Sequence, residues 1–219
     1  MGMANIDTRI HTLLDPKNCV VVMIDFQPQM TFATKSIDGQ TLINNATGLA
    51  KGAKIFNVPT ILTTVAEKSF AGPFFPQVRK VFPDQQLIDR TTMNCWEDKR
   101  VVDAIKKTGR KKIVFAGLWT EVCIVLPTIM ALEEGFEVYV VADACGGTSQ
   151  VAHDMAMLRM IQAGAVPITW MQFVLELQRD WARTETYDAV TTLAREDAGS
   201  YGMGLEYAKA MLGEHAKEG

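Results

Sequence analysis

The sequence has few of the features that mark membrane, exported and nucleic-acid-binding proteins. Its longest uninterrupted apolar run, Cys19–Ile24, is far shorter than the roughly 20 residues that span a bilayer. The segment 1–15 is polar and mixed, so we expect no secretory signal. The net charge is −3 and charges of both signs are interspersed, which gives no basic surface for nucleic acid or acidic membranes. These absences favour a cytoplasmic protein that acts on a small molecule.

Motifs for disulfides, nucleotides and a Cys–His pair are also missing. The four cysteines show no C-x-x-C spacing and are expected to be reduced thiols: Cys19, Cys95, Cys123 and Cys145. Only three histidines occur, and none stands where a Cys–His pair would need it: His11, His153 and His215. The pair Gly146-Gly147 is too short a run for a phosphate loop. We therefore expect no cofactor, and a nucleotide-binding module is disfavoured.

The pattern of apolar residues predicts a single α/β domain over residues 1–219. Hydrophobic residues make up 48% of the 219, which is enough for one sizeable core. Short β-rich runs alternate with amphipathic helical stretches, as in a parallel sheet covered by helices. The predicted strands are 19–24, 59–65, 86–89, 112–116, 137–142 and 166–170, and the predicted helices are 42–56, 98–108, 121–134 and 150–163. We predict a three-layer, doubly wound, mostly parallel six-stranded sheet of order 3-2-1-4-5-6.

The segment 171–219 extends beyond the predicted sheet. Its composition is helical, with aromatic residues placed among charges. Two interpretations are open: an arm that packs on a neighbouring subunit, or a helical cover for the same chain.

Three reactive side chains follow predicted strands: Asp25, Arg90 and Cys123. Ligands of doubly wound sheets bind beyond the carboxyl ends of the strands, where the strand order reverses. Because strands 1 and 4 are neighbours there, Asp25 and Cys123 should face each other, with Arg90 reaching in from the same edge. A helix N-terminus and a nearby cation lower the pKa of a thiol, and a carboxylate can carry its proton to a leaving amine.

Three stretches resemble the isochorismatase-like cysteine hydrolases: Ile24-Asp25-Phe26-Gln27, the turn Gly-Leu-Trp-Thr-Glu-Val-Cys at 117–123, and Ala-Asp-Ala-Cys-Gly-Gly at 142–147. The resemblance extends over about residues 15–181 and is to the YcaC-like branch, whose members form homo-octamers. It implies the isochorismatase-like fold, Asp25 as the base and Cys123 as the nucleophile. It also implies a cis Leu118–Trp119 peptide and an oxyanion hole formed by the N–H groups of Trp119 and Cys123.

The resemblance also implies a cation in a catalytic triad and, in some relatives, a metal. This chain has Arg90 where most members have lysine, and a guanidinium can stabilise a thiolate but cannot carry a proton. Lys80 is the alternative cation. Metal-binding relatives hold the ion with histidines around strands 2 and 3, and no histidine occurs between His11 and His153. We expect no catalytic metal.

Several side chains near the strand ends are candidates for a substrate pocket: Gln27, Phe70, Phe74, Phe75, Asn94, Trp96 and Thr120. Thr120 has a simpler alternative role as a cap of the helix that follows it.

These features predict a cysteine-dependent amidohydrolase, which cleaves a C–N bond of a small amide or carbamoyl compound through a thioester. One alternative is a vinyl-ether hydrolase of the isochorismatase type, which needs no nucleophile, so that Cys123 argues against it. The other is a catalytically idle oligomeric scaffold. An activated Cys123 should be alkylated at a pH well below 8, which separates an enzyme from a scaffold.

Overall fold

The computed structural model describes residues 13–213, so His11 and His215 lie outside the described residues. Their strands form one sheet in the order β3-β2-β1-β4-β5-β6, and every neighbouring pair is parallel. The order is the predicted one. The strands are β1 (Cys19–Ile24), β2 (Thr60–Val65), β3 (Leu87–Arg90), β4 (Lys112–Leu118), β5 (Glu137–Gly146) and β6 (Val166–Ile168).

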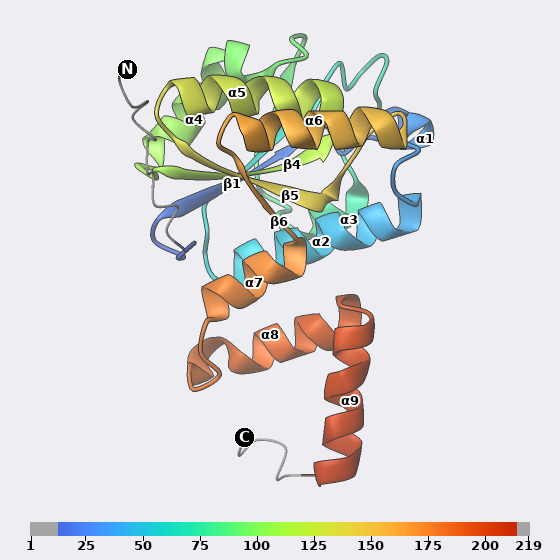
Figure 1. Ribbon diagram of the computed structural model, residues 1–219, viewed down its shortest axis with the longest axis vertical. Coiled ribbons are helices and arrows are strands. Elements are labelled where there is room, and N and C mark those ends of the chain that lie inside the picture. The colour runs from blue at the N-terminus through green and yellow to red at the C-terminus, as the bar shows by residue number, and fades with distance from the viewer. Residues whose placement is uncertain (1–12, 214–219) are drawn as a thin grey trace, which may run out of the picture.

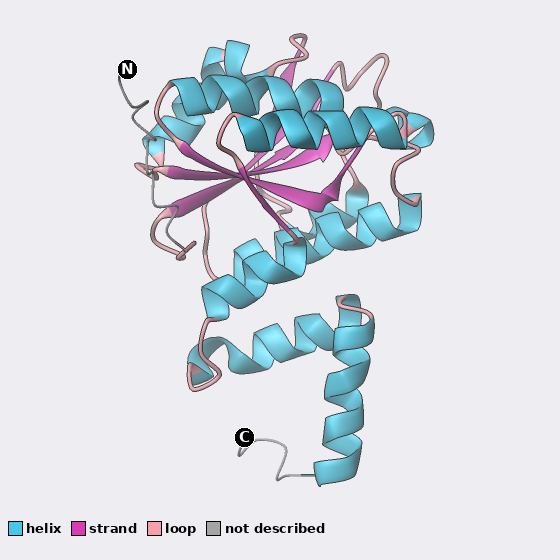
Figure 2. Cartoon of the chain, viewed as in Figure 1, coloured by secondary structure: helices cyan, strands magenta, loops and turns pink. Residues whose placement is uncertain are grey.

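Helices cover both faces of this sheet (Figures 1 and 2). One face carries α4 (Lys99–Lys107), α5 (Val125–Glu133) and α6 (Gln150–Gln162), and the other carries α2 (Gly39–Ile55), α3 (Pro76–Val81) and α7 (Trp170–Gln178). The short helix α1 (Pro28–Ala33) follows β1. All six residues of β1 are buried, as expected for a central strand covered on both faces.

Three predicted boundaries differ from the structure, one of them because of a helix cap. The strand predicted at 166–170 ends at Ile168, because the Thr169 side chain accepts a hydrogen bond from Gln172 N and caps α7. The helix predicted from 121 begins instead with a π-helical turn, Thr120–Ile124, that leads into α5. Strand β5 continues to Gly146, beyond the predicted end at Ala142.

The segment after residue 170 begins inside the core. Helix α7 packs so tightly on α2 that a Cβ on Gly48 would lie 2.6 Å from the Trp170 ring, and one on Gly52 2.5 Å from Val174. Helix α8 (Thr184–Asp197) packs on α2 from outside, and α9 (Ser200–Leu212) runs from the end of α8 away from the sheet (Figure 1). None of the described helices is long and apolar enough to cross a membrane.

Gly117 sets the spacing between the two central strands at their carboxyl ends. Its φ is +150°, and a Cβ there would lie 1.9 Å from the carbonyl oxygen of Ile24. Only glycine therefore allows β1 and β4 to approach this closely, one residue before Asp25 on one strand and two residues before Trp119 on the other.

We expect Gly117→Ala to lower the free energy of unfolding by about 3 kcal/mol or more, because a central-strand carbonyl cannot move aside at low cost. Gly135→Ala is the matched control: φ is +86° but a Cβ meets nothing within 4 Å. It should cost about 1 kcal/mol. Denaturant titrations of both variants measure the difference, and equal losses would contradict this role for Gly117.

Candidate active site

Asp25 lies at the carboxyl end of β1 in a sharply turned backbone. Its φ is +54°, which is uncommon for a residue with a side chain. Two backbone hydrogen bonds hold this conformation: Asp25 N donates to Thr63 O at 3.0 Å, and Gln27 N donates to Asp25 O at 2.8 Å. The side chain is fully buried. The turn thus fixes a carboxylate in the interior, at the edge of the sheet where ligands of this fold bind.

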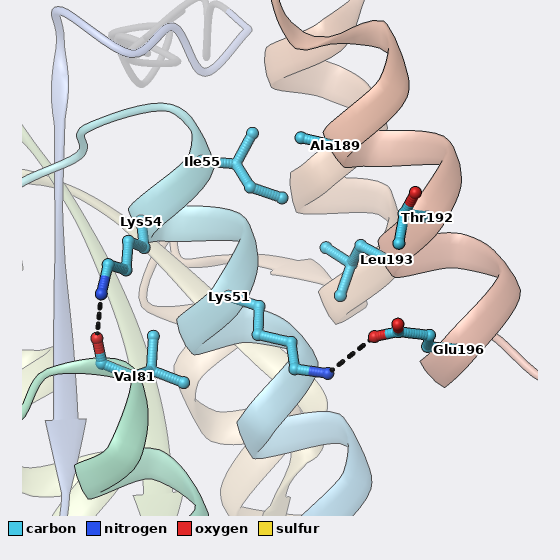
Figure 3. A pocket seen from close by; sticks show the side chains of 8 residues that line it. All are labelled: Lys51, Lys54, Ile55, Val81, Ala189, Thr192, Leu193 and Glu196. Atoms are coloured by element: carbon cyan, nitrogen blue, oxygen red, sulfur yellow. Dashed lines mark hydrogen bonds and ion pairs between the residues drawn. The ribbon is translucent and has the colours of Figure 1, made fainter.

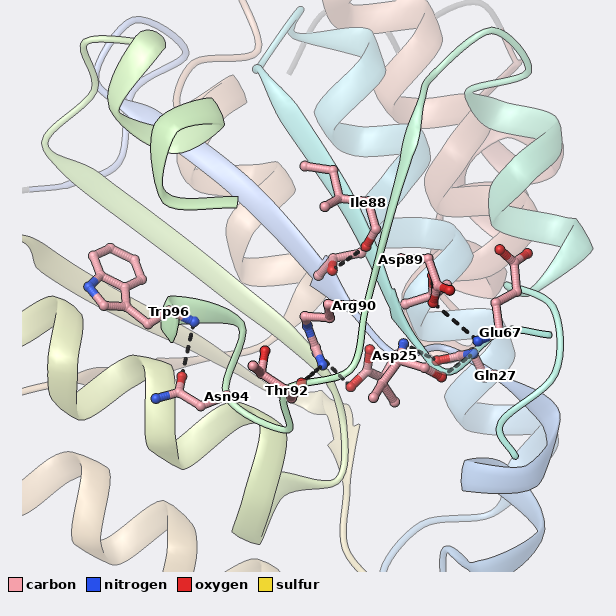
Figure 4. Close-up of polar contacts among 12 residues, drawn as sticks. Asp25, Gln27, Glu67, Ile88, Asp89, Arg90, Thr92, Asn94 and Trp96 are labelled. Atoms are coloured by element: carbon pink, nitrogen blue, oxygen red, sulfur yellow. Dashed lines mark hydrogen bonds and ion pairs between the residues drawn. The ribbon is translucent and has the colours of Figure 1, made fainter. Parts of the chain in front are cut away.

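Arg90 forms a buried ion pair with this carboxylate (Figure 4). Arg90 Nη2 lies 2.7 Å from Asp25 Oδ2, and both side chains are fully buried. Arg90 Nη1 also donates a hydrogen bond to the Thr92 carbonyl, which fixes the guanidinium plane. Lys80, the alternative cation, is exposed on α3. The cation beside Asp25 is therefore Arg90.

Cys123 lies in the π-helical turn after β4 and is only 2% exposed. The charges of Asp25 and Arg90 both act on the pKa of its thiol, so the thiol lies near this ion pair. Asp25 Oδ1 has no hydrogen-bond partner among the described residues. The structure thus brings Asp25, Arg90 and Cys123 together from three different strand ends, as the strand order predicts.

Burial dominates the protonation of these groups. Desolvation raises the pKa of Asp25 to about 6, although Arg90 and the Cys123 thiol both favour its ionised form. Desolvation also raises the pKa of the Cys123 thiol, and the charge of Asp25 adds to this effect while Arg90 opposes it. The expectation that a helix N-terminus and a cation depress this pKa is therefore wrong for the resting site. The thiol is neutral there, and Asp25 is mostly ionised at neutral pH.

The backbone before Cys123 is held by its own contacts. The Leu118–Trp119 peptide is cis, as the family resemblance implied. Val122 N and Ile124 N donate to the Trp119 carbonyl at 3.0 and 3.3 Å, and the Trp119 indole donates to Met30 O at 2.8 Å. A hydrogen bond from the Trp119 backbone lowers the pKa of Cys123, so this amide is directed at the sulfur.

Comparison with known proteins gives the family. Residues 19–172 match the model of the isochorismatase domain. The chain is 39% identical to "Probable hydrolase YcaC" of Escherichia coli (strain K12) over 175 residues, which cover 80% of this chain and 84% of that protein. The chain belongs to the isochorismatase family.

Solved structures agree with this assignment. The octameric YcaC hydrolase of Escherichia coli, whose specificity is unknown, superposes with a TM-score of 0.87 at 36% identity, covering 94% of this chain and 100% of that chain. YcaC from Pseudomonas aeruginosa was solved with hexane-2,5-diol and covalent acrylamide. It superposes with a TM-score of 0.86 at 34% identity, covering 90% of this chain and 97% of that chain. The chain is thus a YcaC-like hydrolase of the isochorismatase family.

Gln27 supports the site of this hydrolase rather than facing a ligand. Its carboxamide accepts a hydrogen bond from Val65 N at 3.0 Å and donates to Val65 O and Gly72 O at 3.1 and 2.6 Å. It therefore ties the end of β2 and the following loop to the turn at Asp25. In that loop Phe74 and Phe75 are buried against Phe26, whereas Phe70 is 62% exposed.

Asn94 and Trp96 belong to the protein interior. The Asn94 side chain accepts a hydrogen bond from Trp96 N at 3.0 Å and caps a 3-10 turn at Cys95–Glu97. Trp96 packs edge-on against Phe115 and Phe136, and its indole donates to Glu134 at 2.8 Å. Figure 4 shows it well apart from the Asp25–Arg90 pair, so it stabilises the core rather than a pocket wall.

Thr120, which the sequence predicts as a pocket residue or a helix cap, is a neighbour of the site, and its partner His153 was not found from the sequence. Thr120 is fully buried, and its hydroxyl lies 2.8 Å from Nδ1 of His153, which therefore holds the turn that carries Cys123. Cys95 is fully buried, and burial raises its pKa to about 12 although the charge of Arg90 opposes this.

A groove of about 360 Å³ lies between α2, α3 and α8 (Figure 3). It includes the last turn of α2, which precedes β2, so it lies toward the amino ends of the strands. Both lysine ammonium groups are engaged: Lys54 donates to Val81 O at 2.6 Å, and Lys51 pairs with Asp197 at 2.6 Å. The groove is therefore separate from the catalytic edge. No group of three or more His, Cys, Asp or Glu side chains that could hold a metal occurs within residues 13–213.

We expect Arg90→Met to lower the free energy of unfolding by about 3–5 kcal/mol, because it leaves the buried Asp25 charge without a partner. Lys99→Met is the control, since the Lys99–Asp103 pair is 85% and 57% exposed; it should cost less than about 1 kcal/mol. Denaturant titration at pH 8 measures both. An Arg90→Met loss as small as the control would mean that the ion pair does not constrain the fold.

Proposed function

We propose that the protein hydrolyses a C–N bond of a small amide or carbamoyl compound, with Cys123 as the nucleophile. The observation that carries this proposal is the thiol of Cys123 beside a carboxylate that a buried guanidinium holds in place. Thiol, carboxylate and guanidinium supply a nucleophile, a proton acceptor and a fixed positive charge at one strand edge.

In the first step Asp25 takes the thiol proton while the sulfur attacks the carbonyl carbon. A neutral thiol beside an ionised carboxylate whose pKa is about 6 suits this transfer, since the base is free at neutral pH. The N–H groups of Trp119 and Cys123 stabilise the oxyanion. Arg90 stays charged throughout and offsets the negative charge that moves from oxygen to sulfur.

In the second step the intermediate collapses. Protonated Asp25 gives its proton to the leaving nitrogen, the C–N bond breaks, and an acyl thioester on Cys123 remains. Asp25, again ionised, then takes a proton from a water molecule that attacks the thioester. The acid product leaves and the thiol is restored, so that protons and electron pairs balance over the cycle.

A relative forms a covalent adduct with an amide reagent. Acrylamide is an unsaturated amide that reacts with thiolates, and Pseudomonas aeruginosa YcaC was solved with covalent acrylamide. A vinyl-ether hydrolase or an idle scaffold would have no use for a thiol, a base and a cation held together in this way.

We further propose that the chain is one cytoplasmic domain that assembles into a homo-oligomer. Escherichia coli YcaC is octameric. Helix α9 exposes Met203, Tyr207 and Met211, which suits an arm that packs on another subunit. All four cysteines are free, as in a reducing compartment.

Replacing the nucleophile tests the proposed function. We expect Cys123→Ala to lower ammonia release from any accepted amide by at least about 10⁴-fold and to abolish labelling by acrylamide, detected by mass spectrometry. The control is Cys19→Ala, because Cys19 lies at the opposite end of β1 from Asp25. This variant should keep both the ammonia release and the labelling by acrylamide. Ammonia release that survives Cys123→Ala would exclude the thioester mechanism.

The pH dependence tests the role of Asp25. Since the base must be ionised, the rate of Cys123 alkylation by iodoacetamide should fall about tenfold per pH unit below about 6 and be level just above it. An ordinary thiol would instead gain rate up to pH 8–9. Asp25→Asn should remove the inflection near pH 6. An inflection that persists in that variant would assign it to another group.

A further inference from the structure

Helix α6 carries an apolar ridge on its solvent side, formed by Val151, Met155 and Leu158. These side chains are 71%, 56% and 46% exposed, whereas Ala156, Met157 and Met160 on the opposite side are buried. The spacings of four and three residues place the ridge along one line of the helix. Helix α6 runs beside α5 on one face of the sheet (Figure 1). The exposure of the ridge places it on the side of α6 that faces solvent. A continuous exposed apolar stripe of this kind marks an interaction surface.

Opposite charges flank the ridge. At 100° per residue Asp154 lies on one side of it and Arg159 on the other. Both are exposed, and neither forms an ion pair with a residue of the described chain. The contact that occupies Asp154 is a hydrogen bond from Gln150, at 2.8 Å. The surface is therefore apolar along its centre, acidic on one flank and basic on the other.

We propose that this ridge packs against the same ridge of a second copy of the chain, with the two α6 helices parallel across a two-fold axis. Val151, Met155 and Leu158 then occupy the d, a and d positions of a short heptad seam, with Asp154 at g and Arg159 at e. In a parallel pair the g residue of one helix faces the e residue five positions further along the other. Asp154 of each copy thus meets Arg159 of the other, and two ion pairs form.

The charges also select the orientation. In an antiparallel pair g faces g and e faces e, so that Asp154 would meet Asp154 and Arg159 would meet Arg159. Such like-charge contacts disfavour that arrangement. Three side chains per copy bury less than the roughly 1,200–2,000 Å² of a stable interface, so the α6 contact works with others in the assembly.

This surface adjoins the catalytic turn. Thr148, just before α6, donates from its N and hydroxyl to Glu121 Oε1 at 2.9 and 2.7 Å, and His153 within α6 bonds to Thr120. A second copy bound to α6 therefore restricts the motion of the turn that carries Cys123. The inference rests on the proposal that the chain self-associates and adds the surface through which it does so.

A charge swap tests the pairing. In Asp154→Arg and in Arg159→Asp both intermolecular pairs become like-charged, so each single variant should raise the concentration of half-dissociation at least about tenfold. The double variant Asp154→Arg/Arg159→Asp restores two opposite-charge pairs and should return to within about threefold of the parent. Light scattering over a dilution series measures this, and Asp103→Arg on α4 is the control for a charge reversal elsewhere.

A cysteine cross-link tests the same contact independently of charge. Leu158 faces Leu158 of the second copy in a parallel seam, so Leu158→Cys should give disulfide-linked dimers on mild oxidation, whereas Asp103→Cys should not. A parent that is monomeric at every concentration would refute self-association itself. An assembled parent whose single charge variants are unchanged, or whose double variant is no better than either, would overturn the α6 contact alone.

Discussion

One carboxylate–guanidinium contact in the interior determines the placement of the whole site. Arg90 reaches Asp25 at 2.7 Å from the end of β3, across the end of β2, with both side chains fully buried. Removing a carboxylate from water costs several kcal/mol, and an unpaired one would remain protonated up to a high pH. The guanidinium limits this cost, so the pKa of Asp25 rises only to about 6. Asp25 therefore keeps its charge at neutral pH and can accept a proton.

Backbone features beside this contact fix the carboxyl ends of β1, β2 and β4 relative to one another. Gly117 lets β4 approach the Ile24 carbonyl, the φ of +54° at Asp25 turns the chain at the edge, and Gln27 bonds to both backbone groups of Val65 at the end of β2. These are short-range constraints on neighbouring strands of one parallel sheet. A thiol, a carboxylate and a guanidinium are then gathered at one place, because the sheet itself supplies the common edge.

The sequence predicts those parts of the structure that depend on pattern. Continuous apolar runs such as Cys19–Ile24 predict the central strands. The reactive residues that follow strands, Asp25, Arg90 and Cys123, are then predicted to be neighbours. Properties that depend on residues distant in the sequence, such as pKa values and side-chain contacts, could not be predicted. The pKa of Cys123 follows from desolvation, which no local motif reports. Gln27 and Trp96 look like pocket residues by position, but the partners that bind them, Val65 and Glu134, lie 38 residues away in each case.

Arginine rather than lysine beside Asp25 restricts which groups of the site can exchange protons. A lysine ammonium buried beside Asp25 would have its pKa lowered by desolvation and could exchange a proton with the carboxylate. A guanidinium holds its charge under the same burial, and the ion pair with Asp25 raises the pKa of Arg90 further. In the mechanism we propose, proton transfer is then confined to Asp25, Cys123 and the substrate. The fixed charge stabilises negative charge on either group, since Arg90 favours the ionised form of both Asp25 and Cys123. The neutral thiol of the resting site follows from burial and from the charge of Asp25, and Arg90 opposes both effects.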